Sequence, residues 1–412
     1  MSLNNTPSGE RVHIGIFGKR NAGKSSLLNA ITGQKLAIIS EEPGTTTDPV
    51  KKAMEILPLG PVVIIDTPGF DDEGTLGKLR VEKSVEALRK CDIVLLVISA
   101  EEGISESETS FIKEIQDRKL PYIICINKID VVKAFDNCDR NIVLKGFENV
   151  ESLGAEAVLY VSANSNVGID ELKEKIASLN PDKTEKHVIA DLVESGDTVV
   201  LVVPIDESAP KGRLILPQQQ VIRDLLEVGA IAVVTKDTEL SETLNKLSVP
   251  PKVVVTDSQA FGKVSKIVPE DVYLTSFSIL MARYKGDLKW QVNGAKAIEE
   301  LKDGSKVLIS EGCTHHRQCG DIGTVKLPTW MKEYTGKQLE FVFTSGGEFP
   351  DDLSEYDMIV HCGGCTLNEQ EMKYRIANAK NQGIPITNYG VIISYINGIL
   401  ERSLRLLTIQ GK

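Results

Sequence analysis

The stretch that decides the fold is Val12-His-Ile-Gly-Ile-Phe17, followed by Gly18-Lys-Arg-Asn21-Ala22-Gly23-Lys24-Ser25. The first run is apolar enough for a buried strand, and the second matches the pattern G-x-x-x-x-G-K-S. The segment Ser26-Leu-Leu-Asn-Ala-Ile31 then predicts a helix. A strand, a glycine-rich loop and a helix in this order predict a P-loop, in which backbone amides surround the phosphates of a nucleotide.

Further polar loops follow along the chain, most of them directly after an apolar strand. They are Pro43–Asp48, then Asp66–Gly69 after Val62–Ile65, Asn127–Asp130 after Tyr122–Ile126, and Ser162–Asn164 after Val158–Val161. A carboxylate at Asp130 can accept hydrogen bonds from N1–H and the 2-amino group of guanine, whereas adenine offers neither donor. The first part of the chain is therefore predicted to bind GTP in preference to ATP.

Each loop has an expected role in nucleotide hydrolysis. Lys24 would neutralise the β- and γ-phosphates, and Ser25 would bind Mg²⁺. Thr46 lies in the loop expected to close on the γ-phosphate and Mg²⁺, Asp66 would hold the ion through water, and the Gly69 amide would sense the γ-phosphate. The predicted catalytic residues are Lys24, Ser25, Thr46, Asp66 and Gly69. The predicted GTP-binding residues are Gly18, Asn21, Ala22, Gly23, Lys24, Ser25, Ser26, Asn127, Lys128, Asp130, Ser162, Ala163 and Asn164.

These motifs resemble those of the translation-factor-like GTPases, and within them the Era/TrmE group. The resemblance is carried by Gly18–Ser26, by Gly44-Thr-Thr46 and by Asn127-Lys-Ile-Asp130. Phe70 stands where Ras-like enzymes carry a glutamine that orients water, so the resemblance implies another means of catalysis. Asn21 matches the asparagine that helps potassium-activated relatives hold K⁺ against the phosphates. The alternative for Asn21 is an ordinary loop residue.

The middle of the chain has strand and helix patterns but no catalytic set of residues. A polar linker, Asn180–Lys186, precedes it. The expected strands are Thr198–Ile205, Ala230–Thr235 and Lys252–Thr256, and the expected helices are Leu216–Val228 and Leu240–Leu247. An all-apolar strand such as Thr198–Ile205 needs cover on both faces, which so small a unit can lack. We therefore predict an association domain that forms a homodimer.

The C-terminal part contains the residue types that bind metals. Cys313-Thr-His315 follows the apolar run Lys306–Glu311, and His361-Cys362-Gly-Gly-Cys365 completes and follows the run Asp357–His361. Parallel strands would bring both groups to their carboxyl ends, where open α/β sheets bind ligands. Three thiols with two imidazoles suit either a closed zinc site or an iron–sulfur cluster. A helix beginning near Asn368 would favour the thiolate at Cys365.

Length and patterning predict an α/β fold of three domains with mainly parallel sheets, since 412 residues exceed one ordinary domain. We expect a P-loop GTPase domain at 1–180, a dimerisation domain at 181–265 and a metal-cluster domain at 266–412. The last domain should also contain two helices at 276–285 and 287–301, strands at 339–343 and 385–388, and one long final helix from Val391.

The charge, the apolar runs and the cysteine count of the chain argue against several classes of function. The formal net charge of −11 and the pI near 5.2 argue against a general nucleic-acid or anionic-membrane surface. No apolar run is long enough to cross a membrane, and the N-terminus lacks a signal-peptide core. Seven cysteines in so long a chain do not make a disulfide framework. These features predict a cytoplasmic protein.

A GTPase of this type joined to C-x-H…H-C-x-x-C resembles the HydF family of [FeFe]-hydrogenase maturation GTPases over the whole chain. The 45 residues between the two histidines are slightly fewer than is usual there. The resemblance implies a homodimeric carrier that binds a [4Fe–4S] cluster through Cys313, Cys362 and Cys365. It also implies GTP/GDP, Mg²⁺ and K⁺ as cofactors. The carrier would take a transient two-iron precursor made with the radical-SAM maturases HydE and HydG, and deliver it to apo-[FeFe]-hydrogenase.

Three cysteines leave one iron of such a cluster without a thiolate. His315, His361, Asp321 or water could fill that position, and Cys319 could compete. A second hypothesis is a GTP-dependent switch in tRNA or ribosome maturation with a structural zinc, against which the acidic charge counts. Iron and sulfide in the purified protein, as opposed to zinc, would separate the two hypotheses.

Overall fold

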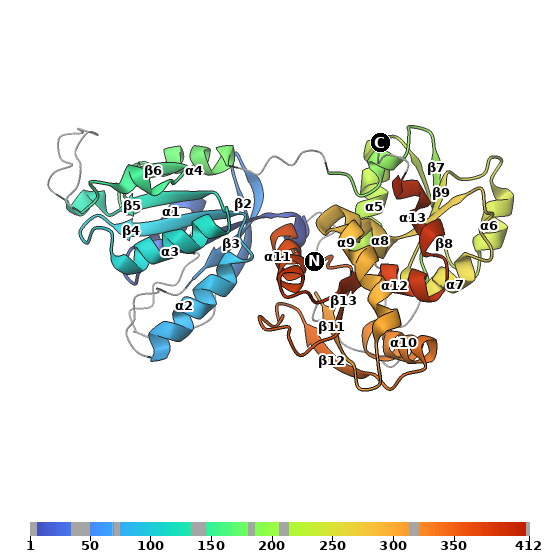
Figure 1. Ribbon diagram of the computed structural model, residues 1–412. Helices are drawn as coiled ribbons and strands as arrows, with labels where there is room; N and C mark the ends of the chain where they lie inside the picture. Colours follow the sequence, from blue (N-terminus) through green and yellow to red (C-terminus); the bar gives the residue numbers. More distant parts are fainter. Residues whose placement is uncertain are drawn as a thin grey trace. The chain divides into compact units, whose positions relative to one another are not determined.

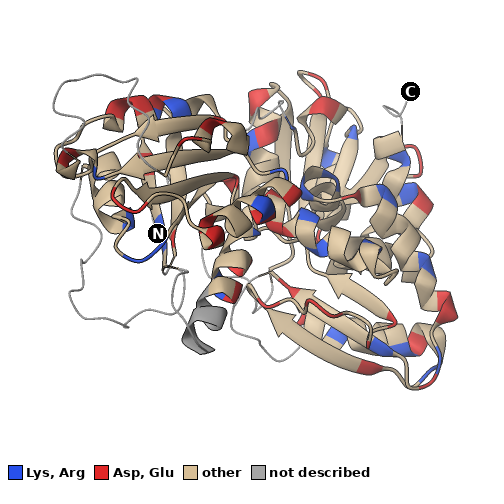
Figure 2. Cartoon of the chain, turned by 60° about the vertical axis from the view of Figure 1, so that its left-hand side comes forward, with Lys and Arg blue, Asp and Glu red and all other residues tan. Residues whose placement is uncertain are grey.

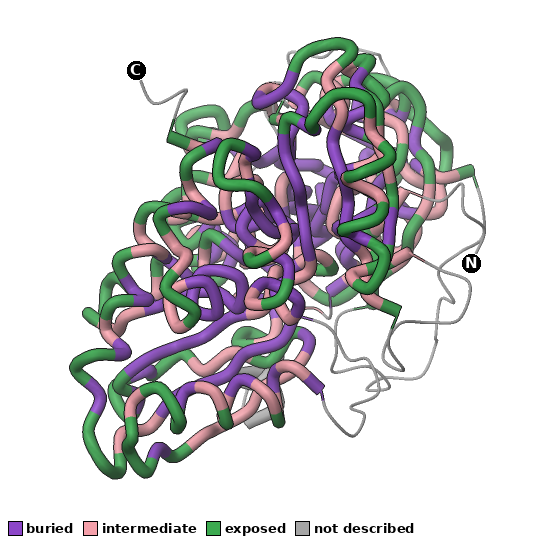
Figure 3. The backbone as a smooth tube through the Cα atoms, turned by 90° about the vertical axis from the view of Figure 1, so that its right-hand side faces the viewer, coloured by how far each residue is buried: buried purple, intermediate pink, exposed green. Residues whose placement is uncertain are grey.

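The computed structural model describes residues 6–33, 50–67, 69, 75–132, 146–179, 186–205, 214–312 and 321–408 (Figure 1). It separates into two compact units, residues 1–184 and 185–412. Figure 3 marks the buried and exposed positions along the chain. Most strands are buried, but the strands at 50–56 and 231–235 carry several exposed residues. Charged residues of both signs are scattered along the chain (Figure 2). No helix in the described ranges is long and apolar enough to span a bilayer.

The first unit is built on one six-stranded sheet in the order β2-β3-β1-β4-β5-β6. All its neighbouring strands are parallel except β2, which runs antiparallel to β3. The strands are β1 Val12–Phe17, β2 Val50–Ile56, β3 Gly60–Asp66, β4 Ile93–Ser99, β5 Tyr122–Asn127 and β6 Ala157–Tyr160. The helices are α1 Lys24–Thr32, α2 Thr75–Leu88, α3 Glu106–Asp117 and α4 Ile169–Ser178.

The apolar strands of this sheet are buried on both faces because helices cover each side. Ile14 and Ile16 of β1 pack with α1 and α4, whereas Phe17 packs with α3 through a ring contact to Phe111 at 5.0 Å between centroids. Alternation along each strand sends neighbouring side chains to opposite cores. The loops after β1, β3 and β5 therefore meet at one edge of the sheet, as the sequence predicts for a P-loop domain.

The second unit contains two four-stranded parallel sheets, in the orders β10-β9-β7-β8 and β12-β11-β13-β14. The strands are β7 Thr198–Val202, β8 Ile231–Thr235, β9 Val253–Thr256, β10 Tyr273–Ser276, β11 Lys306–Glu311, β12 Glu340–Ser345, β13 Met358–His361 and β14 Ile386–Asn388. The helices are α5 Leu216–Glu227, α6 Leu240–Lys246, α7 Phe261–Val264, α8 Phe277–Lys285, α9 Leu288–Ala295, α10 Leu327–Thr335, α11 Glu369–Asn381, α12 Tyr389–Ile396 and α13 Leu400–Thr408.

One hydrophobic core joins the two sheets of this unit. It contains Val200 and Val254 of the first sheet together with Ile309 and Val360 of the second. The last helix, α13, packs along β10, so the end of the chain covers the sheet formed near residue 200. This shared core explains why residues 185–412 form one compact unit although they contain two sheets.

Three features differ from the expectations. β10 lies beyond residue 265 and pairs with β9, so the second sheet ends later than the predicted boundary. The predicted long final helix is two helices, because Gly398 has a φ of +69° that ends the first one. The strand near 200 finds its cover within its own unit, with Val199–Val202 fully buried. The burial argument for a dimer was therefore wrong.

Candidate functional site

The P-loop needs its glycines because other parts of the unit approach the backbone closely. Gly18 has a φ of +147°, and a Cβ there would lie 2.2 Å from the carbonyl oxygen of Val97. Gly23 has a φ of +90°, and a Cβ there would lie 2.2 Å from Nδ2 of Asn127. Only glycine accepts both the backbone angle and the close contact. The loop is thus fixed against β4 and β5 at the carboxyl edge of the sheet.

Lys24, the first residue of α1, is nearly buried beneath this loop. Its Nζ donates to the carbonyl oxygens of Gly18 at 2.8 Å and Lys19 at 2.7 Å. The side chain therefore lies along the concave side of the loop, where its charge can meet a phosphate. Ser25 and Ser26 follow in the first turn of α1, whose amino end favours anions.

Asp66 ends β3 beside the P-loop. Burial raises the pKa of its carboxyl group, and the nearby charges of Lys24 and Lys52 oppose the rise. The next residue, Thr67, is tied to the neighbouring strand, since its hydroxyl donates to the carbonyl oxygen of Ile16 at 2.8 Å. A cation bound beside Asp66 would stabilise the carboxylate, as expected for a water-mediated Mg²⁺ contact.

The predicted base-binding residues converge in space. Asn127 donates through Nδ2 to the carbonyl oxygen of Ala22 at 3.0 Å and accepts from the Ala163 amide at 3.1 Å. Asp130 accepts from the Ser162 hydroxyl at 2.7 Å and from Nδ2 of Asn164 at 3.4 Å. These bonds connect the P-loop, the loop after β5 and the loop after β6. The hydrogen bond from Ser162 is the main reason that the pKa of Asp130 is lowered, so its carboxylate stays ionised.

Lys128 takes the left-handed backbone conformation, with φ of +65°, and pairs with Glu101 at 3.6 Å. Gly69 is described, but Thr46 and Phe70 lie outside the described residues, as do Cys313, His315 and Cys319. The described residues of the GTP site are thus gathered at one edge, and the roles of all predicted residues remain predictions.

In the second unit, Cys362 and Cys365 lie in the loop between β13 and α11. The loop is anchored at its start, where the Cys362 amide donates to the carbonyl oxygen of Ser310 at 3.0 Å. Gly364 allows its sharp turn, with φ of +62° and a close approach to Met372, whose Sδ would lie 2.6 Å from an added Cβ. Asn368 caps α11 by accepting from the Glu371 amide at 3.2 Å.

Backbone amides point at the sulfur of Cys362. The Gly312 amide donates to Sγ at 3.0 Å and the Gly364 amide at 3.4 Å. Such donors stabilise charge on a metal-bound thiolate and tune iron–sulfur clusters. Gly312 is also the residue that precedes Cys313 in the chain. The residue that follows β11 therefore contacts the sulfur of Cys362 through its backbone amide.

Burial opposes thiolate formation at both cysteines. It raises the pKa of Cys362 to about 11, and it also raises the pKa of Cys365 against the opposing charge of Lys285. The free thiol at Cys365 is therefore not shifted toward the thiolate as expected from the amino end of α11, because desolvation by burial has the largest effect on its pKa. A bound metal would have to drive the deprotonation.

Lys285, the last residue of α8, holds the same loop from its other end. Its buried ammonium group donates to the carbonyl oxygens of Leu367 at 3.0 Å and Cys365 at 3.3 Å. This role could not be predicted from the sequence, since a lysine at the end of a helix ordinarily faces solvent.

Among the residues that the structure describes, both ring nitrogens of His361 have partners other than a cysteine sulfur. The side chain is fully buried, Nδ1 lies 2.8 Å from the carbonyl oxygen of Cys362, and Nε2 lies 3.0 Å from Nη1 of Arg375. Burial, helped by the Arg375 charge, lowers the pKa of His361 to about 3, so the ring is neutral. This arrangement counts against His361 as the fourth ligand. Asp321, another candidate, accepts from the amide and hydroxyl of Thr324.

The described residues fit one side of a metal cluster. Two thiols, two amides directed at one of them and a glycine turn provide the donors and the curvature that such a group needs. Within the described ranges no three metal-binding side chains form a group. The predicted ligands Cys313 and His315 lie outside those ranges. The ligand set thus remains a prediction.

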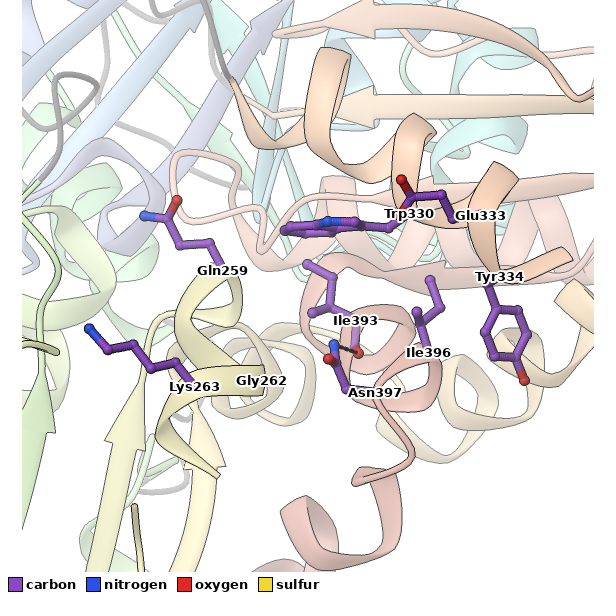
Figure 4. Close-up of a pocket in the computed structure, with 9 residues that line it drawn as sticks. All are labelled: Gln259, Gly262, Lys263, Trp330, Glu333, Tyr334, Ile393, Ile396 and Asn397. Atoms are coloured by element: carbon purple, nitrogen blue, oxygen red, sulfur yellow. Dashed lines mark hydrogen bonds between the residues drawn. The ribbon is translucent and has the colours of Figure 1, made fainter. Parts of the chain in front are cut away.

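A separate hollow of about 490 Å³ lies between α7, α10 and α12 (Figure 4). Trp330, Ile393 and Ile396 form its apolar part, and Gln259 and Lys263 lie on the opposite side. The lining contains no cysteine or histidine and a single carboxylate, Glu333. It therefore lacks a set of groups for catalysis or metal binding.

The fold and the first site define a P-loop GTPase joined to a further α/β unit. Residues 13–128 match the 50S ribosome-binding GTPase domain. Residues 188–286 match the hydrogen maturase F dimerization domain, and residues 289–406 match the hydrogen maturase F tetramerization domain. The chain therefore belongs to the hydrogen maturase F (HydF) family of hydrogenase maturation GTPases.

Two curated relatives each match about two fifths of the chain. The chain is 37% identical over 165 residues to tRNA modification GTPase MnmE of Desulforamulus reducens, covering 40% of this chain and 33% of the relative. It is 33% identical over 170 residues to GTPase Era of Carboxydothermus hydrogenoformans, covering 41% of this chain and 55% of the relative. The chain thus spans about a third to a half of these relatives. A crystal structure of Aquifex aeolicus Era bound to GDP·AlF4⁻ matches with a TM-score of 0.36 and 22% identity, covering 54% of this chain and 92% of that one.

Proposed function

We propose that this chain is a GTP-hydrolysing scaffold that holds a [4Fe–4S] cluster on Cys313, Cys362 and Cys365. It would accept the two-iron precursor of the [FeFe]-hydrogenase active site, made with HydE and HydG, and deliver it to apo-hydrogenase. The observation that carries the proposal is the glycine turn after β13, which presents two cysteines and directs two amides at one sulfur. That turn belongs to a chain of the hydrogen maturase F family.

When bound, a [4Fe–4S] cluster held by three thiolates supplies one iron with an exchangeable position. The chain's own residues would bind the cluster and limit access to it. Lys285 fixes one end of the ligand loop through the carbonyl oxygens of Cys365 and Leu367. His361 fixes the other end by contacting the carbonyl oxygen of Cys362.

The test is the metal content of the full chain after anaerobic purification and reconstitution. Brown protein with iron and inorganic sulfide near four of each per chain, and activation of apo-hydrogenase, would support the proposal. Colourless protein with one zinc and no iron would overturn it in favour of a structural zinc site. The tRNA-modifying relatives give that alternative little support, since residues 188–406 match domains of the hydrogen maturase F family.

We further propose that K⁺ assists hydrolysis through Asn21. Its backbone φ of +59° is one that asparagine tolerates better than most residues, which alone could explain its presence. Asn21→Gly separates the two explanations, because glycine keeps this backbone and removes the side-chain oxygen. We expect wild-type hydrolysis to be faster in KCl than in NaCl, and the difference to vanish in Asn21→Gly. A potassium dependence that survives in Asn21→Gly would contradict this role.

For the homodimer we propose pairing at β8, an edge strand of its sheet. Ile231 and Val234 of this strand are 52% and 48% exposed, and an apolar edge invites a second chain. The dimerization-domain match over residues 188–286 supports this choice.

Val234→Lys should therefore convert dimers to monomers, because lysine on an edge strand blocks further pairing. Light scattering coupled to size-exclusion chromatography would measure the molar mass. Val249→Lys is the matched control, since Val249 is 67% exposed but lies outside the strand. An unchanged mass for Val234→Lys would place the interface elsewhere.

A further inference from the structure

Arg375 of α11 is a fully buried cation behind the cysteine loop. Its Nε donates to Oε1 of Glu371 at 2.8 Å, and its Nη2 donates to the carbonyl oxygen of Gly346 at 2.9 Å. Its Nη1 lies 3.0 Å from Nε2 of His361 and donates to Oγ of Ser310 at 3.3 Å. One side chain therefore contacts α11, β11, the end of β13 and the loop after β12.

These contacts decide which nitrogen of His361 carries the proton. A guanidinium group has no acceptor and keeps its protons at all ordinary pH values, so Nε2 of His361 must accept from Arg375. Nδ1 then carries the hydrogen and donates it to the carbonyl oxygen of Cys362 at 2.8 Å. The hydrogen bonds therefore connect the Arg375 guanidinium group to the His361 imidazole, and the imidazole to the backbone of Cys362.

The same guanidinium also holds the loop that follows β12. Besides the bond to Gly346, its plane lies over the Phe349 ring, with 5.0 Å from Cζ to the ring centroid. Ser310 completes the connection, because its side chain contacts Arg375 while its carbonyl oxygen accepts from the Cys362 amide. The loop after β12 and the start of the cysteine loop are thus attached to one rigid group.

We propose that Arg375 is a positioning residue, which acts through His361 and Gly346 to hold the cysteine loop and the loop after β12 in one fixed arrangement. The consequence for the cluster rests on the proposed function, since the loop is held so that Cys362 and Cys365 can bind it. His361 then serves to orient Cys362 and is not itself a ligand. This role explains why a histidine directly precedes the first cysteine of the C-x-x-C pattern.

A buried ion pair can also be a feature of packing alone, and the variants must separate the two roles. Arg375→Lys keeps the charge but loses the planar fork that reaches Gly346 and His361 together. Arg375→Met with Glu371→Leu removes both buried charges, a change that folded proteins often tolerate. Lys373→Met is the control, since Lys373 is on the same helix with its side chain 57% exposed.

The first measurement is hydrogen exchange of the full chain without iron, followed by mass spectrometry. We expect exchange in peptides covering 344–350 and 358–366 to be at least tenfold faster in Arg375→Lys and in the charge-free double variant. Exchange in β7, β9 and β11 and the rate of GTP hydrolysis should match wild type. Lys373→Met should match wild type throughout. Unchanged exchange in both segments, or faster exchange across the whole second unit in both variants, would overturn the proposal.

The second measurement is anaerobic reconstitution of the same proteins with iron and sulfide. We expect severalfold less iron per chain in Arg375→Lys, a broadened EPR signal, and little further loss when His361→Gln is added, because both act on one connection. Equal iron and an identical signal in Arg375→Lys would overturn the positioning role for the cluster. If wild type takes up no cluster while the exchange differences hold, the proposed function fails and the positioning of the two loops stands.

Discussion

Replacing Cys362 by alanine is expected to remove most of the iron that the chain retains after anaerobic reconstitution, and with it the activation of apo-hydrogenase. The Cys362 sulfur is the one that both the Gly312 and Gly364 amides contact, so its loss leaves these donors without their acceptor. Changes to groups that merely surround a metal ligand weaken binding by about 10- to 100-fold. Loss of the ligand itself should exceed that range. Iron and sulfide analysis measures the effect.

Cys365→Ala should behave in the same way, because a cluster attached at two irons is easily lost. Cys125→Ala is the control for removing a thiol. Cys125 is buried in β5 of the GTPase unit, where desolvation raises the pKa of its thiol to about 12, and it has no predicted part in metal binding. That variant should keep its iron. GTP hydrolysis should be unchanged in the two ligand variants, since they lie outside residues 1–184. Full iron content and full hydrogenase activation in Cys362→Ala would contradict the carrier role.

Local patterns predicted the GTPase part well because its chemistry is determined by short segments. The glycine loop, the strand before it and the polar loops after β3, β5 and β6 each appear in the sequence as one continuous motif. Parallel pairing then brings Asn127 to Ala22 and Ala163 without any information beyond the order of strands. The placement of the two cysteines after β13 followed from the same reasoning.

Tertiary burial was the property that the sequence did not reveal. Glu371 and Arg375 are four residues apart on a helix, a spacing that ordinarily indicates an exposed ion pair. In the structure both are buried, because the loop after β12 and His361 cover that face of α11. The burial of Lys285 was not predicted for the same reason. The exposure of β8 was likewise not predicted. Its sequence is apolar, as in a buried strand, yet Ile231 and Val234 are exposed.

Changing Asp130 to asparagine is expected to lower kcat/KM for GTP by a factor of about 10² to 10⁴. The carboxylate can accept two hydrogen bonds from guanine, and a bond to a charged group contributes roughly 1.5–3 kcal/mol. Ser162 and Asn164 hold this carboxylate in place and keep it ionised. Asparagine would present an amide donor to the 2-amino donor of guanine. Steady-state phosphate release with GTP and ATP measures the change.

Xanthosine triphosphate gives the sharper comparison, because a carbonyl replaces the 2-amino group of guanine. An amide donor at residue 130 should bind that carbonyl, so the variant should hydrolyse xanthosine triphosphate better than wild type does, while its activity with ATP stays low. Asp170→Asn, a carboxylate on α4 whose side chain is 96% exposed, should leave all three activities unchanged. If Asp130→Asn kept full preference for GTP, the base would be recognised by other groups. The convergence of Asn127, Ser162 and Asn164 around Asp130 would then serve the fold of these loops alone.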